Sequence, residues 1–187
     1  MLQIKYLYDD NISIEMTTPL PPTPNCNYLN SDQILFGWYP DRPDSSGLYS
    51  NNINALLSTG RTVFVNLTTS EETHLLYDYV SYLDQMNPKP LYYSYAIPDC
   101  GIPNDMESFR KFIIELHKLV QQGHKLYIHC RGGHGRSGIV AGCLLIQMGH
   151  TADEALDMIS AAHKTREYLP NYPCPQTDEQ RRFIQNY

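Results

Sequence analysis

The sequence predicts an α/β fold in three layers, with a central, mostly parallel sheet between two layers of helices. The first observation is that strand-like and helix-like segments alternate from residue 34 to the end of the chain. The second is a long apolar run over residues 138–146, which is typical of a buried core helix. Third, a length of 187 residues with 42% hydrophobic residues suits one globular domain with a full core.

Composition restricts the classes of partner and compartment. With 14 basic and 20 acidic residues the net charge is −6, which argues against nucleic acid as a partner because DNA binding requires a basic face. No stretch reaches the roughly 18–20 uninterrupted apolar residues of a transmembrane helix. The N-terminus lacks the pattern of a secretion signal, and five irregularly spaced cysteines make a poor disulfide framework. We therefore expect a cytoplasmic protein.

Residues 1–33 are expected to precede the main domain as a small hairpin over residues 3–16 and a proline-rich strap over residues 17–27. The strap contains four prolines, which exclude regular secondary structure there. The main domain is expected over residues 34–187. The first half of this domain alternates strands with helices, the strands being predicted at residues 34–38, 62–67 and 91–96 and the helices at residues 46–58 and 71–83.

Capping signals define the second half of the domain. Asn104 with Glu107 at the capping-box spacing starts a helix that Gly123 ends, and Thr151 with Glu154 starts another. The first of these helices has one apolar face, formed by Met106, Phe109, Phe112, Ile113, Leu116 and Val120. The remaining predicted elements are a strand at residues 125–130, the apolar helix at residues 138–146 and a last helix from about residue 177.

The most informative segment is KLYIHCRGGHGRSGIVAGC, in which a buried strand is followed by Cys130, by four glycines within nine residues and by a buried helix. In folds of this class, ligands bind where the carboxyl ends of strands turn into helices. Three interpretations of the segment fail. The glycine pattern of a dinucleotide fold comes too late in the chain, and an ATP-type phosphate loop requires a lysine where Arg136 stands. A metal site finds no usual ligand spacing among His124, His129, Cys130 and His134.

The fourth interpretation is a Cys-x5-Arg-Ser anion site. A tight loop at a helix N-terminus directs successive backbone N–H groups inward, and Arg136 adds a planar fork that suits two phosphate oxygens. The same positive surroundings favour the thiolate form of Cys130, which would face the phosphorus of a bound phosphate in line for attack. Glycines let the backbone approach the ligand closely. These residues predict a cysteine nucleophile that acts on a phosphate ester.

The segment HCRGGHGRSG resembles the HCxxGxxR[ST] phosphate loop of the cysteine-based tyrosine and dual-specificity protein phosphatases. Within that superfamily it is most similar to a compact group that includes a cyclin-dependent-kinase-associated phosphatase and bacterial relatives. Three further segments resemble this group, namely the early strand GWYPDRP, the mobile acid loop YAIPDCGIPND and the C-terminal glutamine segment CPQTDEQRRFI. The resemblance runs from about residue 34 to the end and implies a phosphatase fold and activity.

The resemblance implies roles for individual residues. Cys130 forms a phosphocysteine intermediate, Arg136 binds the phosphate and its transition state, and Ser137 donates to the departing thiolate. His129 orients the loop around the nucleophile. The substrate-binding residues are Arg131, Gly132, Gly133, His134, Gly135 and Arg136. Nucleophile, acid and anion site then all come from the chain itself, so we expect no metal and no organic cofactor.

A carboxylic acid must protonate the leaving group. Asp99 matches the family's acid, follows a predicted strand and lies between prolines in a loop expected to close over substrate. Its rival Asp105 suits the first turn of the next helix. Gln176, and less strongly Gln180, is expected to position the hydrolytic water, although some close relatives have an acid where Gln176 stands.

The expected substrate is phosphotyrosine in a protein, with phosphoserine or phosphothreonine as further substrates, because the segments that build a deep phosphotyrosine pocket cannot be recognised. Arg131 and His134 favour an alternative, since phosphatases of this superfamily that act on inositol phosphates or phosphoinositides often carry cationic residues at these two positions. A second alternative is a catalytically weak, phosphate-binding interaction module. Such a module predicts loss of the nucleophile, the arginine or the acid, and the chain retains all three.

Overall fold

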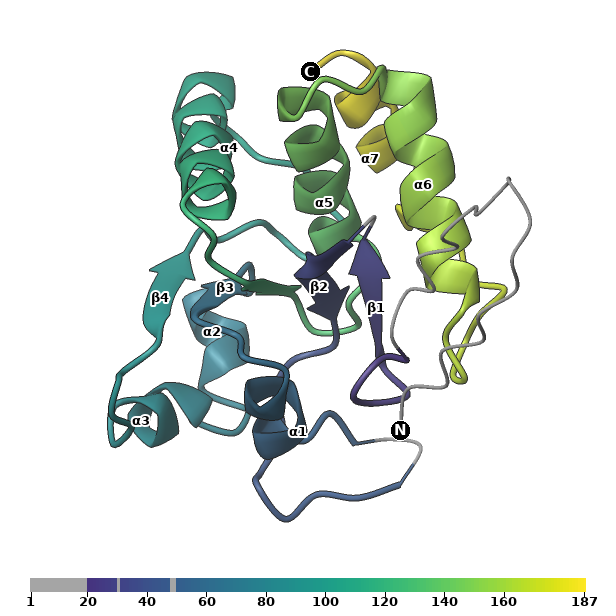
Figure 1. Cartoon of the computed structure of the whole chain (residues 1–187). Coiled ribbons are helices and arrows are strands. Elements are labelled where there is room, and N and C mark those ends of the chain that lie inside the picture. Colours follow the sequence, from purple (N-terminus) through teal and green to yellow (C-terminus); the bar gives the residue numbers. More distant parts are fainter. Residues whose placement is uncertain (1–19, 30, 48–49) are drawn as a thin grey trace, which may run out of the picture.

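A computed structural model describes residues 20–29, 31–47 and 50–187 (Figure 1). Its centre is a five-stranded sheet in the order β1-β2-β5-β3-β4. Neighbouring strands run parallel, except that β1 pairs antiparallel with β2. The bounds of the strands are β1 Cys26–Leu29, β2 Ser31–Gly37, β3 Val63–Asn66, β4 Leu91–Ser94 and β5 Leu126–His129. The predicted, mostly parallel sheet is confirmed.

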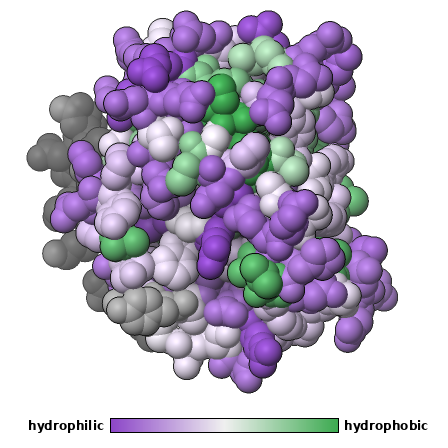
Figure 2. All heavy atoms as spheres, turned by 180° about the vertical axis from the view of Figure 1, so that it is seen from behind, coloured by the Kyte–Doolittle hydropathy of each residue, from purple (hydrophilic) through white to green (hydrophobic). Residues whose placement is uncertain are grey.

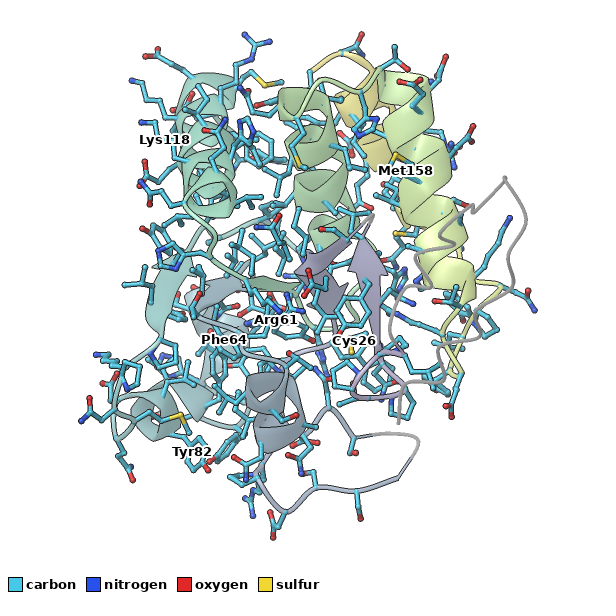
Figure 3. The ribbon with its side chains drawn as sticks, viewed as in Figure 1. Cys26, Arg61, Phe64, Tyr82, Lys118 and Met158 are labelled. Atoms are coloured by element: carbon cyan, nitrogen blue, oxygen red, sulfur yellow. The ribbon has the colours of Figure 1, made fainter. Side chains whose placement is uncertain are left out.

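Helices lie on both sides of this sheet (Figure 1). In the view of Figure 3, Lys118 on α4 and Met158 on α6 lie above the sheet, and Tyr82 on α3 lies below it. The upper layer contains the long helices α4 Met106–Gln121, α5 Arg136–Gln147, α6 Ala152–Lys164 and α7 Asp178–Gln185. The lower layer contains the short helices α1 Ile53–Ser58, α2 Ser70–Thr73 and α3 Tyr79–Leu83.

Alternation along the central strands separates two hydrophobic cores. Ile34 and Phe36 of β2 pack in the core with α4, α5, α6 and α7, whereas Leu35 between them packs in the core with α1 and α3. In β5, Ile128 joins the first core and Tyr127 the second. Successive strand side chains point to opposite faces of a sheet, so each central strand serves both cores. The three-layer α/β fold predicted from the sequence is therefore confirmed.

Helix α4 has the predicted apolar face but begins one residue later than expected. Its cap is Asp105 rather than Asn104, because the carboxylate of Asp105 accepts hydrogen bonds from the backbone N–H groups of Glu107 and Ser108 at 3.0 and 3.4 Å. The buried side of α4 consists of Phe109, Ile113, Leu116, Leu119 and Val120. Capping boxes start α6 and α7 at the predicted Thr151 and Thr177.

Two predicted helices are wrong in extent, because side-chain caps interrupt them. The helix expected at residues 46–58 is only α1, since Asn52 accepts from the N–H groups that open its first turn; residues 48–49 lie outside the described residues. The helix expected at residues 71–83 is two helices, α2 and α3, because Asp78 caps the second of them. The strands predicted at residues 62–67, 91–96 and 125–130 are each shorter by two residues.

The N-terminal segment contributes a strand to the sheet. The hairpin predicted at residues 3–16 lies outside the described residues, and residues 20–25 of the strap have no regular strand or helix, as expected. Cys26 and Asn27, however, belong to β1, which corrects the expectation that regular structure is absent up to residue 27. The four prolines of the strap all precede Cys26, so none of them interrupts the pairing of β1 with β2.

The described surface is mostly polar. Figure 2 shows the rear face as largely hydrophilic, with small apolar areas scattered over it. The exposed large hydrophobic residues are Leu20, Leu75, Leu91, Tyr92, Ile114 and Tyr172. Among the described residues, none of the helices combines the length and apolar character needed to cross a bilayer. All five cysteines lie in the described part of the chain and are free thiols.

Candidate active site

Residues 130–136, which we call the Cys130 loop, connect the end of β5 to the start of α5. The loop packs against the end of β2, where the N–H of Tyr39 donates to the carbonyl of Arg131 at 3.2 Å. Gly133 has φ +65°, and a Cβ atom there would lie 2.1 Å from the backbone carbon of Gly37. Any other residue at position 133 would therefore clash with β2, which explains one of the glycines by packing as well as by backbone conformation.

The sulfur of Cys130 lies inside the loop and is surrounded by hydrogen-bonding groups. The backbone N–H of Gly133 donates to Sγ at 3.1 Å, and the hydroxyl of Ser137 lies 3.7 Å from the same sulfur. Cys130 is buried, and the first turn of α5 begins at the far end of the loop. Inward N–H groups and a helix N-terminus both stabilise negative charge, so this geometry suits a thiolate or a bound oxyanion.

Arg136 is held rigidly in the first turn of α5 although its side chain is only 1% exposed. Its Nη1 and Nη2 donate to the two carboxylate oxygens of Glu72 at 2.5 and 2.9 Å, and Nη1 also donates to the carbonyl of Ile97 at 3.2 Å. Burial by itself would lower the pKa of Arg136, but its hydrogen bonds to Glu72 and the nearby negative groups raise that pKa overall. The bidentate pair fixes the guanidinium plane that a phosphate would meet.

Glu72 is a site residue that the sequence analysis missed. It lies on α2 and also closes the capping box of that helix, accepting from the N–H of Thr69 at 3.0 Å. The hydrogen bond from Arg136 is the main reason that the pKa of Glu72 is lowered, so Glu72 is ionised at neutral pH. The T-x-x-E spacing of residues 69–72 could have revealed the helix start, but not a contact with an arginine 64 positions later.

The structure separates the two aspartates that competed for the role of acid. Asp99, in the loop after β4, forms an ion pair with Nη2 of Arg136 at 2.9 Å while its side chain stays 64% exposed. Asp105 instead caps α4, and hydrogen bonds from that helix lower the pKa of its carboxyl. Only Asp99 of the two contributes to the pocket beside the Cys130 loop.

The two candidate glutamines also have different environments. Gln180 is buried; its Oε1 accepts from the N–H groups of Gln176 and Thr177, and its Nε2 donates to the carbonyl of Gly101 at 3.0 Å. Its amide therefore holds the start of α7 against the Asp99 loop. Gln176 lines the pocket, and its Oε1 would lie 2.8 Å from a Cβ atom at Gly135. Nε2 of Gln180 would also lie 3.2 Å from that Cβ atom, but of the two glutamines Gln176 is the one that lines the pocket.

His129, the last residue of β5, is fully buried behind the loop. Its Nε2 is hydrogen-bonded to the hydroxyl of Tyr79 at 2.7 Å, which links β5 to α3. Burial lowers the pKa of His129 to about 3, so the imidazole is neutral at physiological pH. His129 therefore lies behind the nucleophile as an uncharged, hydrogen-bonded ring that packs against the rings of Tyr39 and Tyr79.

Two buried histidines give the fold a predictable acid sensitivity. Burial lowers the pKa of His129 and of His163 on α6 to about 3, below the ordinary histidine value that applies in the unfolded chain. Between about pH 6.5 and pH 3 the unfolded chain therefore binds more protons than the folded chain. The folded state has its full stability from this source above about pH 6.5 and loses it as the pH falls. We expect the free energy of unfolding to drop by about 2 kcal/mol per histidine between pH 6.5 and 5.

Urea unfolding at pH 7, 6 and 5 measures this loss, because carboxylates remain ionised in both states over most of that range. In the variant His163→Gln, the free energy of unfolding should change less steeply with pH, by about one proton taken up on unfolding. This difference is expected whatever the stability of the variant at pH 7. A stability that does not change between pH 7 and 5 would contradict the neutral, buried state of these rings.

The two basic residues inside the loop differ in accessibility. His134 is buried, its Nδ1 donates to the carbonyl of Pro173 at 3.1 Å, and burial lowers its pKa, so the ring is neutral at pH 7. Arg131 is exposed at the surface of the loop. The expectation that both residues present positive charge to a ligand is thus met in the structure by Arg131 alone.

A pocket of about 490 Å³ opens beside the Cys130 loop. It is lined by residues from the end of β2, the turn after α2, the Asp99 loop, the Cys130 loop and the segment before α7: Trp38, Tyr39, Pro40, Asp41, Leu76, Tyr77, Asp99, Arg131, Gly132, His134 and Gln176. The pocket thus combines one aromatic wall with polar groups around the loop that carries the thiol.

Known proteins resemble this chain in sequence and in fold. A family model described as a Swiss Army Knife protein, DSP-PTPase phosphatase domain, matches residues 44–172. Protein 067L of Invertebrate iridescent virus 3 and protein 197R of Invertebrate iridescent virus 6, both named as candidate tyrosine phosphatases, are 30% and 32% identical over 170 and 166 residues. These matches cover 86% and 87% of this chain, which spans 64% and 53% of the lengths of the two viral proteins.

Solved structures with the same fold span several kinds of protein. A kinase-associated phosphatase with its catalytic cysteine substituted has a TM-score of 0.66 and 22% identity, covering 92% of this chain and 95% of that chain. PTPMT1 in complex with PI(5)P has a TM-score of 0.61 and 16% identity, covering 83% and 92%. At these identities the likeness establishes the fold alone, whereas the family model spans most of the chain. The chain belongs to the Swiss Army Knife family of DSP-PTPase phosphatase domains.

Proposed function

We propose that this protein hydrolyses phosphate monoesters through a phosphocysteine intermediate and that its substrate is phosphotyrosine in proteins. The observation that carries the proposal is the convergence of three groups on one loop. Cys130 lies against the N–H of Gly133, Arg136 is fixed by Glu72, and Asp99 reaches Arg136 from a separate loop. The catalytic domain that we propose comprises residues 34–187 together with β1, which completes the sheet.

In the first step, the Cys130 thiolate attacks phosphorus and forms an S–P bond while the P–O bond to the leaving group breaks. Arg136 and the loop N–H groups bind the non-bridging oxygens, on which charge develops. When the phosphate binds, Nη2 of Arg136 breaks its ion pair with Asp99 and donates a hydrogen bond to a phosphate oxygen instead. The freed carboxylate of Asp99 takes up a proton from solvent and, as a carboxylic acid, gives that proton to the departing oxygen.

In the second step, water attacks phosphorus and the S–P bond breaks, which releases inorganic phosphate and restores the thiolate. Asp99, now a carboxylate, takes the proton of the attacking water, which Gln176 positions. The hydroxyl of Ser137, 3.7 Å from Sγ, donates to the sulfur as it regains negative charge. His129 supports the loop as a neutral group and takes no part in proton transfer.

The walls of the pocket favour one aromatic phosphate over a polyphosphorylated ring. Trp38, Tyr39 and Tyr77 provide apolar surface for a phenyl ring beside the loop. Of the two basic loop residues, Arg131 is exposed and charged, whereas His134 is buried and neutral. A pocket whose described lining presents Arg131 as its exposed cation matches a single phosphate better than several. An inositol phosphate or phosphoinositide is the alternative substrate class, which Arg131 favours.

A panel of esters tests the proposal. Phosphate release is measured without added metal from a phosphotyrosine peptide, a matched phosphothreonine peptide, inositol phosphates and phosphoinositides, with Cys130→Ser as the blank for each. We expect kcat/KM to be highest for the phosphotyrosine peptide. A preference for inositol substrates would overturn the substrate class and make Arg131 a specificity determinant. If the wild-type protein releases no more phosphate than Cys130→Ser from every ester, the enzyme proposal fails and the phosphate-binding interaction module is the interpretation that stands.

A further inference from the structure

We infer that Arg166, which follows α6, is a positioning residue that shapes the Cys130 loop from behind and places a buried positive charge next to the nucleophile. This inference rests on the proposed function of the loop. Arg166 lies outside the signature segment HCRGGHGRSG and outside the pocket, and its side chain is only 4% exposed. A buried cation in this position requires a reason, because desolvating an unpaired charge is costly.

The guanidinium of Arg166 holds two consecutive carbonyls of the loop. Its Nη1 donates to the carbonyl of Gly132 at 3.2 Å and its Nη2 to the carbonyl of Gly133 at 2.5 Å. In a trans peptide unit, the carbonyl and the next N–H point in opposite directions. Pulling the Gly132 carbonyl outward therefore turns the N–H of Gly133 inward, where it meets Sγ of Cys130 at 3.1 Å. Arg166 acts on the same N–H groups that would bind a phosphate.

Arg166 is itself fixed by its surroundings. Its Nε donates to Oδ1 of Asn27 at 2.5 Å, and Nδ2 of Asn27 donates to Thr165, next to Arg166, at 2.9 Å. The guanidinium also lies 5.7 Å from the centre of the Phe36 ring. Asn27 comes from β1, which lies in the segment over residues 1–33 that was expected to precede the main domain. The guanidinium of Arg166 is thus bonded on one side to the sheet, through Asn27, and on the other to the Cys130 loop, through the carbonyls of Gly132 and Gly133.

The charge of Arg166 is not neutralised within the described residues. Glu72 and Asp99 pair with Arg136, and no described carboxylate forms an ion pair with Arg166. Burial raises the pKa values of its neighbours Cys26, Tyr127 and Cys174 and lowers those of His134 and His163, which keeps all five neutral at pH 7. His129 is neutral as well. The anion that this cation can stabilise is therefore the Cys130 thiolate or a phosphate in the loop.

Arg61 offers a matched control at the other end of the same strands. It is 3% exposed, donates to the carbonyls of Asp32, Gln33 and Leu126, and lies 5.4 Å from the centre of the Tyr28 ring. Asp32 and Leu126 stand near the starts of β2 and β5, whereas the Cys130 loop follows the end of β5 (Arg61 is labelled in Figure 3). Replacing Arg61 removes a buried, carbonyl-binding arginine without touching the loop.

The test compares the full-length variants Arg166→Met, Arg166→Lys and Arg61→Met with wild type. Alkylation of Cys130 by iodoacetamide is followed across pH by mass spectrometry of its peptide, with the exposed Cys100 as internal reference. We expect Arg166→Met to move the pH midpoint of Cys130 alkylation upward by about one unit. It should also lose about 10–100-fold in kcat/KM. Arg61→Met should lose thermal stability and keep the wild-type midpoint.

Arg166→Lys separates the charge from the geometry. Lysine keeps the positive charge, but its single nitrogen cannot replace the planar fork in which three nitrogens each reach a different acceptor. The pH midpoint of Cys130 alkylation in Arg166→Lys should therefore stay near the wild-type value while kcat/KM remains lowered. A wild-type midpoint in Arg166→Met, or full kcat/KM in both Arg166 variants, would overturn the inference. Alkylation needs no turnover, so the role of Arg166 is decided even if wild type hydrolyses none of the esters and the proposed function fails.

Discussion

Replacing Cys130 by serine is expected to lower kcat by about 10⁴-fold or more while the protein still binds a phosphorylated peptide. A serine hydroxyl fills nearly the same space as the thiol but does not ionise at neutral pH, so the attacking anion is lost. The N–H of Gly133 and the fork of Arg136 remain in place to bind the phosphate. Phosphate release gives kcat, and fluorescence anisotropy of a labelled phosphotyrosine peptide gives Kd.

The matched control for this variant is Cys100→Ser. Cys100 is an exposed thiol beside Asp99, so the substitution makes the same chemical change next to the site without removing the nucleophile. Its kcat should stay close to wild type. Equal losses in the two variants, or retention of most activity in Cys130→Ser, would remove Cys130 from the role of nucleophile.

Replacing Asp99 by asparagine is expected to lower kcat by about 10²–10⁴-fold, because the side chain can no longer give a proton to the leaving oxygen. The loss should be largest for phosphoserine and phosphothreonine peptides, whose alkoxides leave poorly without protonation. It should be smallest for an aryl phosphate whose phenolate leaves easily. The alkaline limb of the kcat profile should also disappear, since no essential acid remains to be deprotonated.

Asp105→Asn is the control that the structure supplies. Asp105 caps α4 through its side-chain oxygen, and asparagine is about as good a cap as aspartate, so both fold and activity should be retained. The same chemical change six positions away thus distinguishes a proton donor from a helix cap. If Asp105→Asn loses more activity than Asp99→Asn, or if the Asp99 loss does not depend on the leaving group, Asp99 is not the acid.

Local signals in the sequence were sufficient for much of this protein. Alternating periodicity predicted the three layers, since the pattern of a strand or helix is carried by neighbouring residues. The cap at Thr151 followed from a spacing of three residues and is present in the structure, whereas the cap expected at Asn104 is formed by its neighbour Asp105. The Cys130 loop was recognisable for the same reason, because Cys130, its glycines and Arg136 lie on one short segment between a buried strand and a buried helix.

Only the tertiary structure decided which distant residues complete the loop. Glu72 meets Arg136 across 64 positions, and Arg166 meets Gly133 across 33. Tertiary contacts also turned His134 toward Pro173 and placed Gln176 rather than Gln180 in the pocket. No local period or spacing encodes such pairs. A long-range contact depends on how strands and helices pack, so the sequence determined the chemistry of the loop, and packing determined the groups that hold it in shape.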